Sequence, residues 1–426
     1  MDRRQYISCI TAVISVGCIG DSSTSNSQPD NTPTETTLEP PEDRFQHPTE
    51  TSYWEFEITN RSTHTVGTEG VYVATESDLS KITAEGISWS IGPMSDLYSV
   101  RSADELYISE DTVYYVARLS KDSEMGAVEA DSGDIMWTRE LDEIPLKIVD
   151  VAEGSVFTSV TNDDPAQTPL YAFNTTTGEE QWQTRTGMDM GSTVSHGLCL
   201  VYSVVDGLTA LATDSGEVQW EHDPGTDYGT DLDVVGDTLC VANEKNIIGY
   251  SLPDGTHQWT YSSDEYVESL LSAPAGSEVA DSIYIANENS NIAALDVSTG
   301  EQRWAVQTDG GQVGHRGINI NSDYLFYHSG TVLAAYDLAT GTKQWENKRN
   351  SNYRASSPYI DGNYLIISFN EGGENPNIAA FETESGSRLW QNQIQTSSEK
   401  APHIGGICND HAILRIQQQL MGVPLN

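Results

Sequence analysis

The chain has 426 residues, and 37% of them are hydrophobic, which is enough to form a sizeable core. Its 64 acidic residues outnumber 21 basic ones, which gives a formal net charge of −43. Because nucleic-acid binding needs Lys and Arg to neutralise phosphates, this charge argues against a nucleic-acid partner. The acids are spread along the whole chain, and molar salt would screen their mutual repulsion. We therefore expect a protein of a halophile, the alternative being an acidic surface that docks basic partners.

The first 17 residues have the features of an export signal. Arg3 and Arg4 precede Tyr6 and an apolar run, Ile10–Val16, that is too short to span a bilayer. We expect residues 1–17 to be a signal peptide of the twin-arginine type. The small residues before Cys18 resemble a lipobox, so Cys18 is the candidate lipidation site. The alternative is that Cys18 is an ordinary residue of a cleaved signal.

Residues 18–50 are dominated by Ser, Thr, Pro, Asn and acidic side chains. Such a segment buries too little apolar surface to fold, so we expect a disordered tether. A lipid at Cys18, this tether and a folded domain at residues 51–426 together predict an extracytoplasmic protein anchored to the cell membrane. One acyl chain binds a membrane only marginally, so the expected anchor is a diacyl group.

One pattern recurs through the folded region, and its clearest copy is ALDVSTGEQRW, Ala294–Trp304. An apolar stretch runs into a polar turn with Gly, and Trp follows four residues after the Gly. Glycine supplies the positive φ of a tight turn, so each copy predicts a β-hairpin. The seven pairs are Gly133 and Trp137, Gly178 and Trp182, Gly216 and Trp220, Gly255 and Trp259, Gly300 and Trp304, Gly341 and Trp345, and Gly386 and Trp390.

A second strand pair precedes each hairpin, as in DSIYIANENSNIAALD, where β-branched and aromatic residues lie between turn residues. Each repeat of about forty residues thus holds four short strands, which is the composition of one propeller blade. Helical repeats have a similar period, but these segments lack apolar residues at helical spacing. The sequence therefore predicts an all-β fold, a β-propeller of four-stranded blades.

The A-x-D-x-x-T-G-x-x-x-W pattern resembles the tryptophan-docking repeat of the quinoprotein-like (PQQ-like) β-propellers. The resemblance extends from about Tyr53 to the C-terminus. It implies that each Trp packs against the neighbouring blade and holds the ring together. It implies much less about function, because the fold hosts both enzymes and scaffolds.

The two ends of the repeat region are incomplete. Residues Tyr53–Ile58 alternate like a strand without a turn Gly before Trp54, and three strands without a closing Trp follow Trp390. We expect these strands to pair and close the ring, which leaves no sheet edge. A degenerate window, Ser80–Trp89, has Gly86 only three residues before its Trp. Propellers usually have four to eight blades, so we set this window aside and expect eight. Seven to nine are admissible, and the full tally gives nine.

Three windows carry extra residues between predicted strands. They lie at Leu97–Leu119 with the polar stretch Arg118–Met125, at Asn162–Pro169 and at Glu371–Asn377. Insertions between blade strands project from a rim of a propeller, where partners bind. We expect these loops to contact a partner, the alternative being drift in loop length without function.

Motifs for catalysis are missing from the sequence. Quinone-dependent dehydrogenases of this fold resemble one another in an adjacent Cys–Cys pair, but here Cys199, Cys240 and Cys408 stand singly in apolar strands. We expect buried structural thiols. The nine His residues show no zinc-ligand spacing. No catalytic residue, cofactor or metal ligand is therefore predicted.

The densest acidic cluster is Asp227, Asp231, Asp233 and Asp237. Asp231 and Asp233 would share one face of a strand, as paired calcium ligands must. No EF-hand spacing is present and acids occur everywhere, so we favour solvation over calcium binding.

These observations predict a non-enzymatic scaffold that presents rim loops to an envelope protein not identified by the sequence. The layout is similar to that of the outer-membrane assembly lipoprotein of bacteria, which is also a repeat ring on a lipid tether. The alternatives are a quinone-dependent or sugar-processing enzyme and a small-ligand sensor, each using the central funnel.

Overall fold

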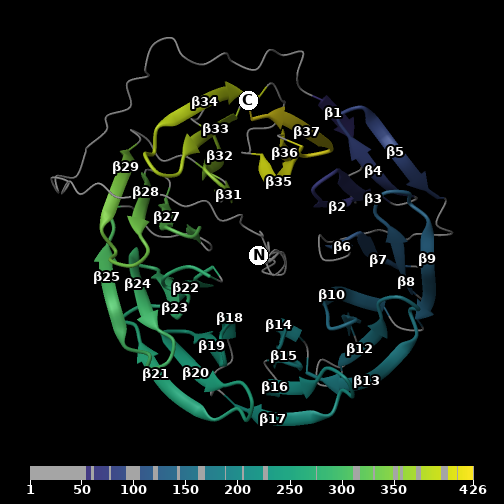
Figure 1. Ribbon diagram of the computed structural model, residues 1–426, viewed down its shortest axis with the longest axis horizontal. Coiled ribbons are helices and arrows are strands. Elements are labelled where there is room, and N and C mark those ends of the chain that lie inside the picture. Colours follow the sequence, from purple (N-terminus) through teal and green to yellow (C-terminus); the bar gives the residue numbers. More distant parts are fainter. Residues whose placement is uncertain are drawn as a thin grey trace, which may run out of the picture.

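The computed structural model is a closed ring of small β-sheets arranged around a central axis (Figure 1). It describes residues 54–425 except 59–61, 76–77, 93–105, 119–122, 142–143, 162–167, 188, 204–205, 224–228, 275, 310–316, 330–331, 349–353, 356–357, 371–375, 395–401 and 410. Among these residues no helix is long and apolar enough to cross a bilayer.

The described strands form nine sheets, each of which is one blade. In each blade the first strand lies nearest the axis and the fourth lies at the periphery. The first five blades are β2 (Thr63–Val66), β3 (Val71–Ala74), β4 (Leu79–Thr83) and β5 (Gly86–Ile91); β6 (Leu106–Ser109), β7 (Thr112–Arg118), β8 (Ser123–Glu129) and β9 (Ile135–Leu141); β10 (Ile144–Ala152), β11 (Ser155–Thr161), β12 (Thr168–Asn174) and β13 (Glu180–Thr186); β14 (Asp189–Ser195), β15 (Leu198–Ser203), β16 (Gly207–Ala212) and β17 (Val218–His222); and β18 (Gly229–Val235), β19 (Thr238–Asn243), β20 (Asn246–Ser251) and β21 (His257–Ser262).

Blades 6 to 9 complete the ring. They are β22 (Val267–Ser272), β23 (Ser282–Asn287), β24 (Asn291–Asp296) and β25 (Gln302–Gln307); β26 (Ile318–Ile320), β27 (Tyr324–His328), β28 (Val332–Asp337) and β29 (Lys343–Lys348); β30 (Arg354–Ala355), β31 (Tyr359–Asp361), β32 (Tyr364–Asn370), β33 (Asn377–Glu382) and β34 (Arg388–Gln393); and β35 (His403–Cys408), β36 (His411–Ile416), β37 (Gln419–Pro424) and β1 (Trp54–Glu57). In blade 8 the innermost position is divided between β30 and β31, which both pair with β32.

The ring is closed by strands from the two ends of the chain, which confirms the expected closure. β1 pairs antiparallel with β37, and Trp54 lies opposite Gly422. Figure 1 shows the purple β1 beside the yellow β37. Blade 9 therefore contains three C-terminal strands and one N-terminal strand, and the ring has a seam between blades 9 and 1.

The number of blades is nine, so the expected eight was one too few and the full tally was right. The window that was set aside is blade 1. In blade 6, Leu295 pairs with Gln302 and Ala294 with Trp304, so the hairpin contains a bulge just before the Trp. Blade 1 keeps this bulge, because Ile82 pairs with Ile87 and Lys81 with Trp89. The residues missing from the degenerate motif are therefore missing from the turn, not from the blade.

The hydrophobic core is divided among the junctions between blades. Each of nine buried clusters combines side chains of two adjacent blades. At the junction of blades 6 and 7, for example, Tyr284 packs with Leu325 and Tyr336. The cluster at the seam includes Val71 from blade 1 and Leu420 from blade 9. Burial of apolar surface thus links every blade to both of its neighbours.

In blades 1 to 7 the Trp on the peripheral strand lies against the glycine turn of the next blade. A Cβ added at Gly178 would lie only 2.5 Å from two ring carbons of Trp137, so the indole contacts the bare backbone. The indole Nε1 of Trp137 also donates a hydrogen bond of 2.8 Å to Thr175 O in the same turn. The same pairing of indole and glycine occurs for Trp89 with Gly133, Trp182 with Gly216, Trp220 with Gly255, Trp259 with Gly300, Trp304 with Gly341 and Trp345 with Gly386.

The glycine has two separate functions in this turn. Its φ lies between 64° and 76° in all seven motif copies, which is a left-handed conformation that disfavours side chains. It also admits the indole. The last of these Trp residues, Trp390, donates to Leu425 O of blade 9 at 3.1 Å, in a blade that has no motif glycine.

The substitution Gly178→Ala separates these two functions when it is compared with Gly154→Ala. Both glycines lie in blade 3 with φ of 64° and 78°, but a Cβ at Gly154 has no atom within 4 Å. Gly154→Ala should cost about 1 kcal/mol for backbone strain. Gly178→Ala should cost about 1–3 kcal/mol more, because the new methyl group clashes with Trp137. Urea unfolding of the full chain measures both losses, and equal losses would contradict docking.

Candidate functional site

The two rims of the ring carry different kinds of connection. Because the strands of each blade are antiparallel, the first-to-second and third-to-fourth connections lie on one rim, here called the turn rim. The second-to-third connections and the links between blades lie on the opposite rim, here called the loop rim. The strands that flank 93–105, 119–122, 162–167 and 371–375 all have the ends nearest these residues at the loop rim. The described strands on either side of the three insertions singled out in the sequence therefore meet the same rim.

Most residues of these insertions lie outside the described residues. Of Asn162–Pro169, the described residues are Thr168 and Pro169, which begin β12. Of Glu371–Asn377, they are Pro376 and Asn377. The predicted polar loop Arg118–Met125 is shorter than expected, because β7 ends at Arg118 and β8 begins at Ser123. Arg3, Arg4 and Cys18 also lie outside the described residues, so export and lipidation remain predictions.

The acidic cluster predicted from the sequence is divided in the structure, because Asp231 and Asp233 both face β22 of the next blade, as two residues on one face of a strand do, whereas Asp237 does not. Asp237 lies in a turn of the turn rim, 3.6 Å from His196 Nε2. Asp233 accepts hydrogen bonds from the backbone N–H groups of Ser272 and Val234, both at 2.8 Å. Asp231 accepts one from Leu270 N at 3.4 Å, and Asp227 lies outside the described residues. Within the described part of the chain, no group of three or more His, Cys, Asp or Glu side chains is placed to hold a metal ion.

The inner-strand carboxylates instead connect neighbouring blades. Ser272 and Leu270, which donate to Asp233 and Asp231, belong to β22 of the next blade. In the same way Asp150 accepts hydrogen bonds from Tyr107 Oη of blade 2 at 2.9 Å and from Val194 N of blade 4 at 3.3 Å. Burial raises the pKa of Asp233, and the hydrogen bonds from Ser272 oppose that rise. These carboxylates satisfy backbone groups at the inner edge of the blades.

The three described cysteines are buried, as expected, and none forms a disulfide with another described residue. Burial raises the pKa of Cys408 to about 11 and also raises that of Cys240. A nucleophilic or metal-binding cysteine needs the opposite shift, toward the thiolate. Cys240 and Cys408 are therefore held as protonated thiols, and Cys408 donates a weak hydrogen bond of 3.6 Å to Thr68 O.

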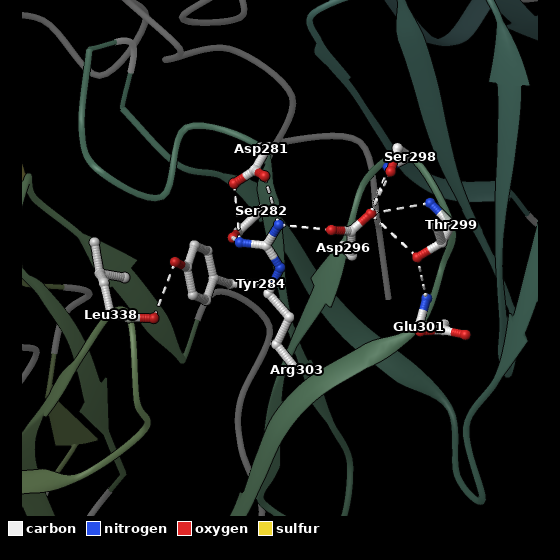
Figure 2. A network of polar contacts seen from close by, with 9 residues as sticks. All are labelled: Asp281, Ser282, Tyr284, Asp296, Ser298, Thr299, Glu301, Arg303 and Leu338. Atoms are coloured by element: carbon white, nitrogen blue, oxygen red, sulfur yellow. Dashed lines mark hydrogen bonds and ion pairs between the residues drawn. The ribbon is translucent and has the colours of Figure 1, made fainter.

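A dense polar network surrounds Arg303 on the turn rim of blade 6, as Figure 2 shows. The guanidinium donates to Asp281 through Nη1 at 2.9 Å and Nη2 at 2.6 Å, and Nη2 also contacts Asp296 at 2.6 Å. Nη1 donates to Ser282 Oγ at 2.8 Å. Arg303 stands directly before Trp304, and in four other blades the residue directly before the Trp is Gln instead: Gln181, Gln219, Gln258 and Gln344.

Both carboxylates in this network are held in the charged state. Hydrogen bonds from Ser298, and then from Arg303 and Thr299, lower the pKa of Asp296. The hydrogen bond from Arg303 lowers the pKa of Asp281, and Asp281 in turn raises the pKa of Arg303. A general acid or base would need a pKa near neutrality. The network therefore fixes the two turns of blade 6 and is no candidate for acid–base chemistry.

Arg303→Gln should lower stability at pH 7 by about 1 kcal/mol or less, because the ion pairs are partly exposed. The folded-state pKa values of Asp281 and Asp296 lie below the unfolded value of about 3.9. The stabilisation that the two charged carboxylates give is thus complete above the unfolded pKa, and it is lost as the pH falls through their folded pKa values. The difference between wild type and variant should shrink below about pH 4.

Thermal unfolding between pH 3 and pH 7 measures this difference. The control is Arg139→Gln, because Arg139 donates to the backbone oxygens Gly178 O and Thr177 O and to no described carboxylate. A difference for Arg303→Gln that does not change with pH would contradict the ionic account.

Comparison with known proteins agrees with this geometry. A family model described as "Outer membrane protein assembly factor BamB" matches residues 44–187 and 166–392. A search of curated proteins finds no match. Among solved structures, BamB from Moraxella catarrhalis is similar at 15% identity and a TM-score of 0.50, covering 74% of this chain and 95% of that one. The computationally designed Ika8 protein (11% identity, TM-score 0.53, 75% and 95% covered) and the C-terminal WD40 domain of Sif2 (12%, 0.53, 75% and 96%) are also similar. These structures show the shared fold, and since the family model matches most of the residues, the chain belongs to the BamB family of β-propellers.

Proposed function

We propose that this protein is a non-enzymatic scaffold that holds another envelope protein against its loop rim. Membership of the BamB family is the observation that carries the proposal, since that family is described by its part in an assembly. The proposal takes from this description only the general role of binding protein partners. It leaves the identity of the partner open.

The ring provides a rigid base for such binding. Buried clusters join all nine pairs of adjacent blades, so a loop on one blade is held at a fixed distance from loops on the others. Loops on a rigid scaffold are where recognition is usually located. The strands that flank the extra residues of blades 2, 3 and 8 have the adjoining ends at the loop rim, which supports that rim over the turn rim as the binding face.

The N-terminal features support a position outside the cytoplasm at a membrane. In this proposal residues 1–17 direct export, Cys18 carries the lipid and residues 18–50 form the tether. A flexible tether of 33 residues has an r.m.s. length on the order of 30 Å. The propeller would therefore stay close to the membrane. The net charge of −43 suits a medium of high salt, where the repulsion between copies is screened.

Site-specific photo-crosslinking in the native cell tests the proposed face. A photoreactive residue would replace the exposed Gln418 or Asp264 on the loop rim, and the exposed Asp111 or Asp323 on the turn rim as matched controls. The loop-rim positions should give discrete adducts with an envelope protein, and the turn-rim positions should not. Adducts from the turn rim alone, or the same adducts from both rims, would refute this choice of face.

Cys18→Ser in the same cells separates anchoring from binding. The variant should leave the membrane fraction, because it loses the proposed lipid attachment. A variant that stays membrane-bound as the wild type does would contradict lipidation at Cys18, whatever the crosslinking result.

A further inference from the structure

Positive charge is scarce in this protein, and nearly all of it is neutralised where the structure describes it. Basic side chains with assigned contacts pair with acids or donate to oxygens. The ion pairs are Lys81 with Asp131, Lys245 with Glu265, Arg303 with Asp281 and Asp296, and Lys343 and Lys348 with Glu346. Arg415 differs, because it makes no ion pair and no hydrogen bond with any described residue.

Arg415 is partly buried near the loop-rim end of β36 in blade 9. Burial lowers the pKa of its guanidinium, and no acid among the described residues opposes this shift. A guanidinium stays protonated in proteins, so its charge remains in this partly desolvated place. Burying an unpaired charge is costly, and a chain with 64 acidic residues has many carboxylates that could have relieved it. An unpaired Arg415 therefore points to an anion from outside the described ring.

Two histidines accompany Arg415 at the seam. His403 lies directly opposite Arg415 in the pairing of β35 with β36. His64 belongs to β2 of blade 1 and reaches across the seam, since a Cβ added at Gly405 would lie 2.6 Å from His64 Nε2. The glycine thus makes room for the imidazole. Residues more than 300 positions apart in the sequence thus lie in one cluster because the ring closes here.

His64 has an unused hydrogen-bonding atom in this cluster. Its Nδ1 is buried and has no hydrogen-bond partner among the described residues. Burial, and then the charges of Arg415 and His403, lower the pKa of His64 to about 3. The imidazole is therefore neutral near pH 7 and offers one N–H donor. A buried polar atom without a partner is unusual and indicates a missing partner.

We infer that Arg415 and His64, with His403 beside them, form a carboxylate-binding site at the seam of the ring. The guanidinium can hold both oxygens of a carboxylate through parallel hydrogen bonds, and the His64 N–H can donate to one of them. Arg415 supplies one positive charge and His64 is neutral, so the cluster can neutralise a singly charged anion but not a doubly charged phosphate. The carboxylate belongs either to a small organic acid or to an acidic residue of a peptide.

The test is a titration of the full chain, with its histidine rings labelled with nitrogen-15 and followed by NMR at constant ionic strength. The probes are acetate, the peptide acetyl-Gly-Asp-Gly-amide, its acetyl-Gly-Asn-Gly-amide counterpart and inorganic phosphate. Carboxylate binding should shift the His64 signal and raise its pKa by at least one unit, because the bound anion offsets the charges of Arg415 and His403. The two carboxylate probes distinguish a small acid from a peptide source, and the Asn peptide should not bind.

Three variants make the titration decisive. Arg415→Gln should weaken carboxylate binding at least tenfold. Arg415→Lys should weaken it less, because the charge remains but the paired donors are lost. Arg388→Gln is the matched control, since Arg388 already donates to Gln391 Oε1 at 2.6 Å, and should bind as the wild type does.

Thermal unfolding without ligand gives a readout that does not depend on binding. Arg415→Gln should unfold at the wild-type temperature or above it, because it removes an unpaired charge. A large drop would mean that Arg415 is neutralised within the chain and would overturn the inference. The inference would also be overturned if the His64 signal of the wild type responded to no carboxylate, or responded more strongly to phosphate. Equal responses in the wild type and in Arg415→Gln would indicate an adventitious ion only and would overturn it too. None of these outcomes bears on photo-crosslinking at the loop rim.

Discussion

The contact between an indole ring and a bare glycine turn is the constraint on which the whole ring depends. In the junction of blades 2 and 3 the ring of Trp137 lies on Gly178, and its N–H bonds to Thr175 O. The contact fixes both the distance and the rotation of one blade relative to the next. Since the contact recurs around the ring, the same arrangement of two adjacent blades is repeated until the ring closes. The buried clusters beneath the indoles then supply most of the apolar burial.

Closure of this circle determines what the molecule presents to its surroundings. Antiparallel strands place short turns, including the glycine turns, on one rim and the longer connections on the other. The turn rim is thus occupied by the glycine turns that receive the indoles of neighbouring blades, and by the network around Arg303 that fixes the two turns of blade 6. The seam between blades 9 and 1 is different again, because there the terminal strands meet and His64 approaches Arg415.

Much of the fold was predictable from the sequence because its signals are local. Glycine and tryptophan at fixed spacing identify the hairpins, and the strands without a partner near Trp54 and after Trp390 indicate closure. The predicted number of blades was wrong because the usual upper limit of eight blades was given more weight than the count of nine repeat windows. The window with Gly86 was set aside, although it differs from the others only in a shorter turn. Asp233 and Asp237 are close in sequence, yet Asp233 bonds to the next blade and Asp237 lies in a turn.

The cluster at the seam could not have been predicted in the same way. His64 and Arg415 are distant in sequence and belong to strands of ordinary appearance. What distinguishes Arg415 is that no described acid pairs with it, and this property can be recognised only in the folded chain. Buried charges without partners are thus visible in structures and hidden in sequences.

A double-mutant cycle between Trp137 and Gly178 tests the central contact most directly. The cycle measures the free energy of unfolding of the full chain for Trp137→Leu, Gly178→Ala, both together and the wild type. Leu removes the ring that meets the new methyl group, so Gly178→Ala should cost less in the Leu background, with a coupling of about 1–3 kcal/mol. Additive losses would show that the indole and the glycine turn do not depend on each other, and would contradict the account.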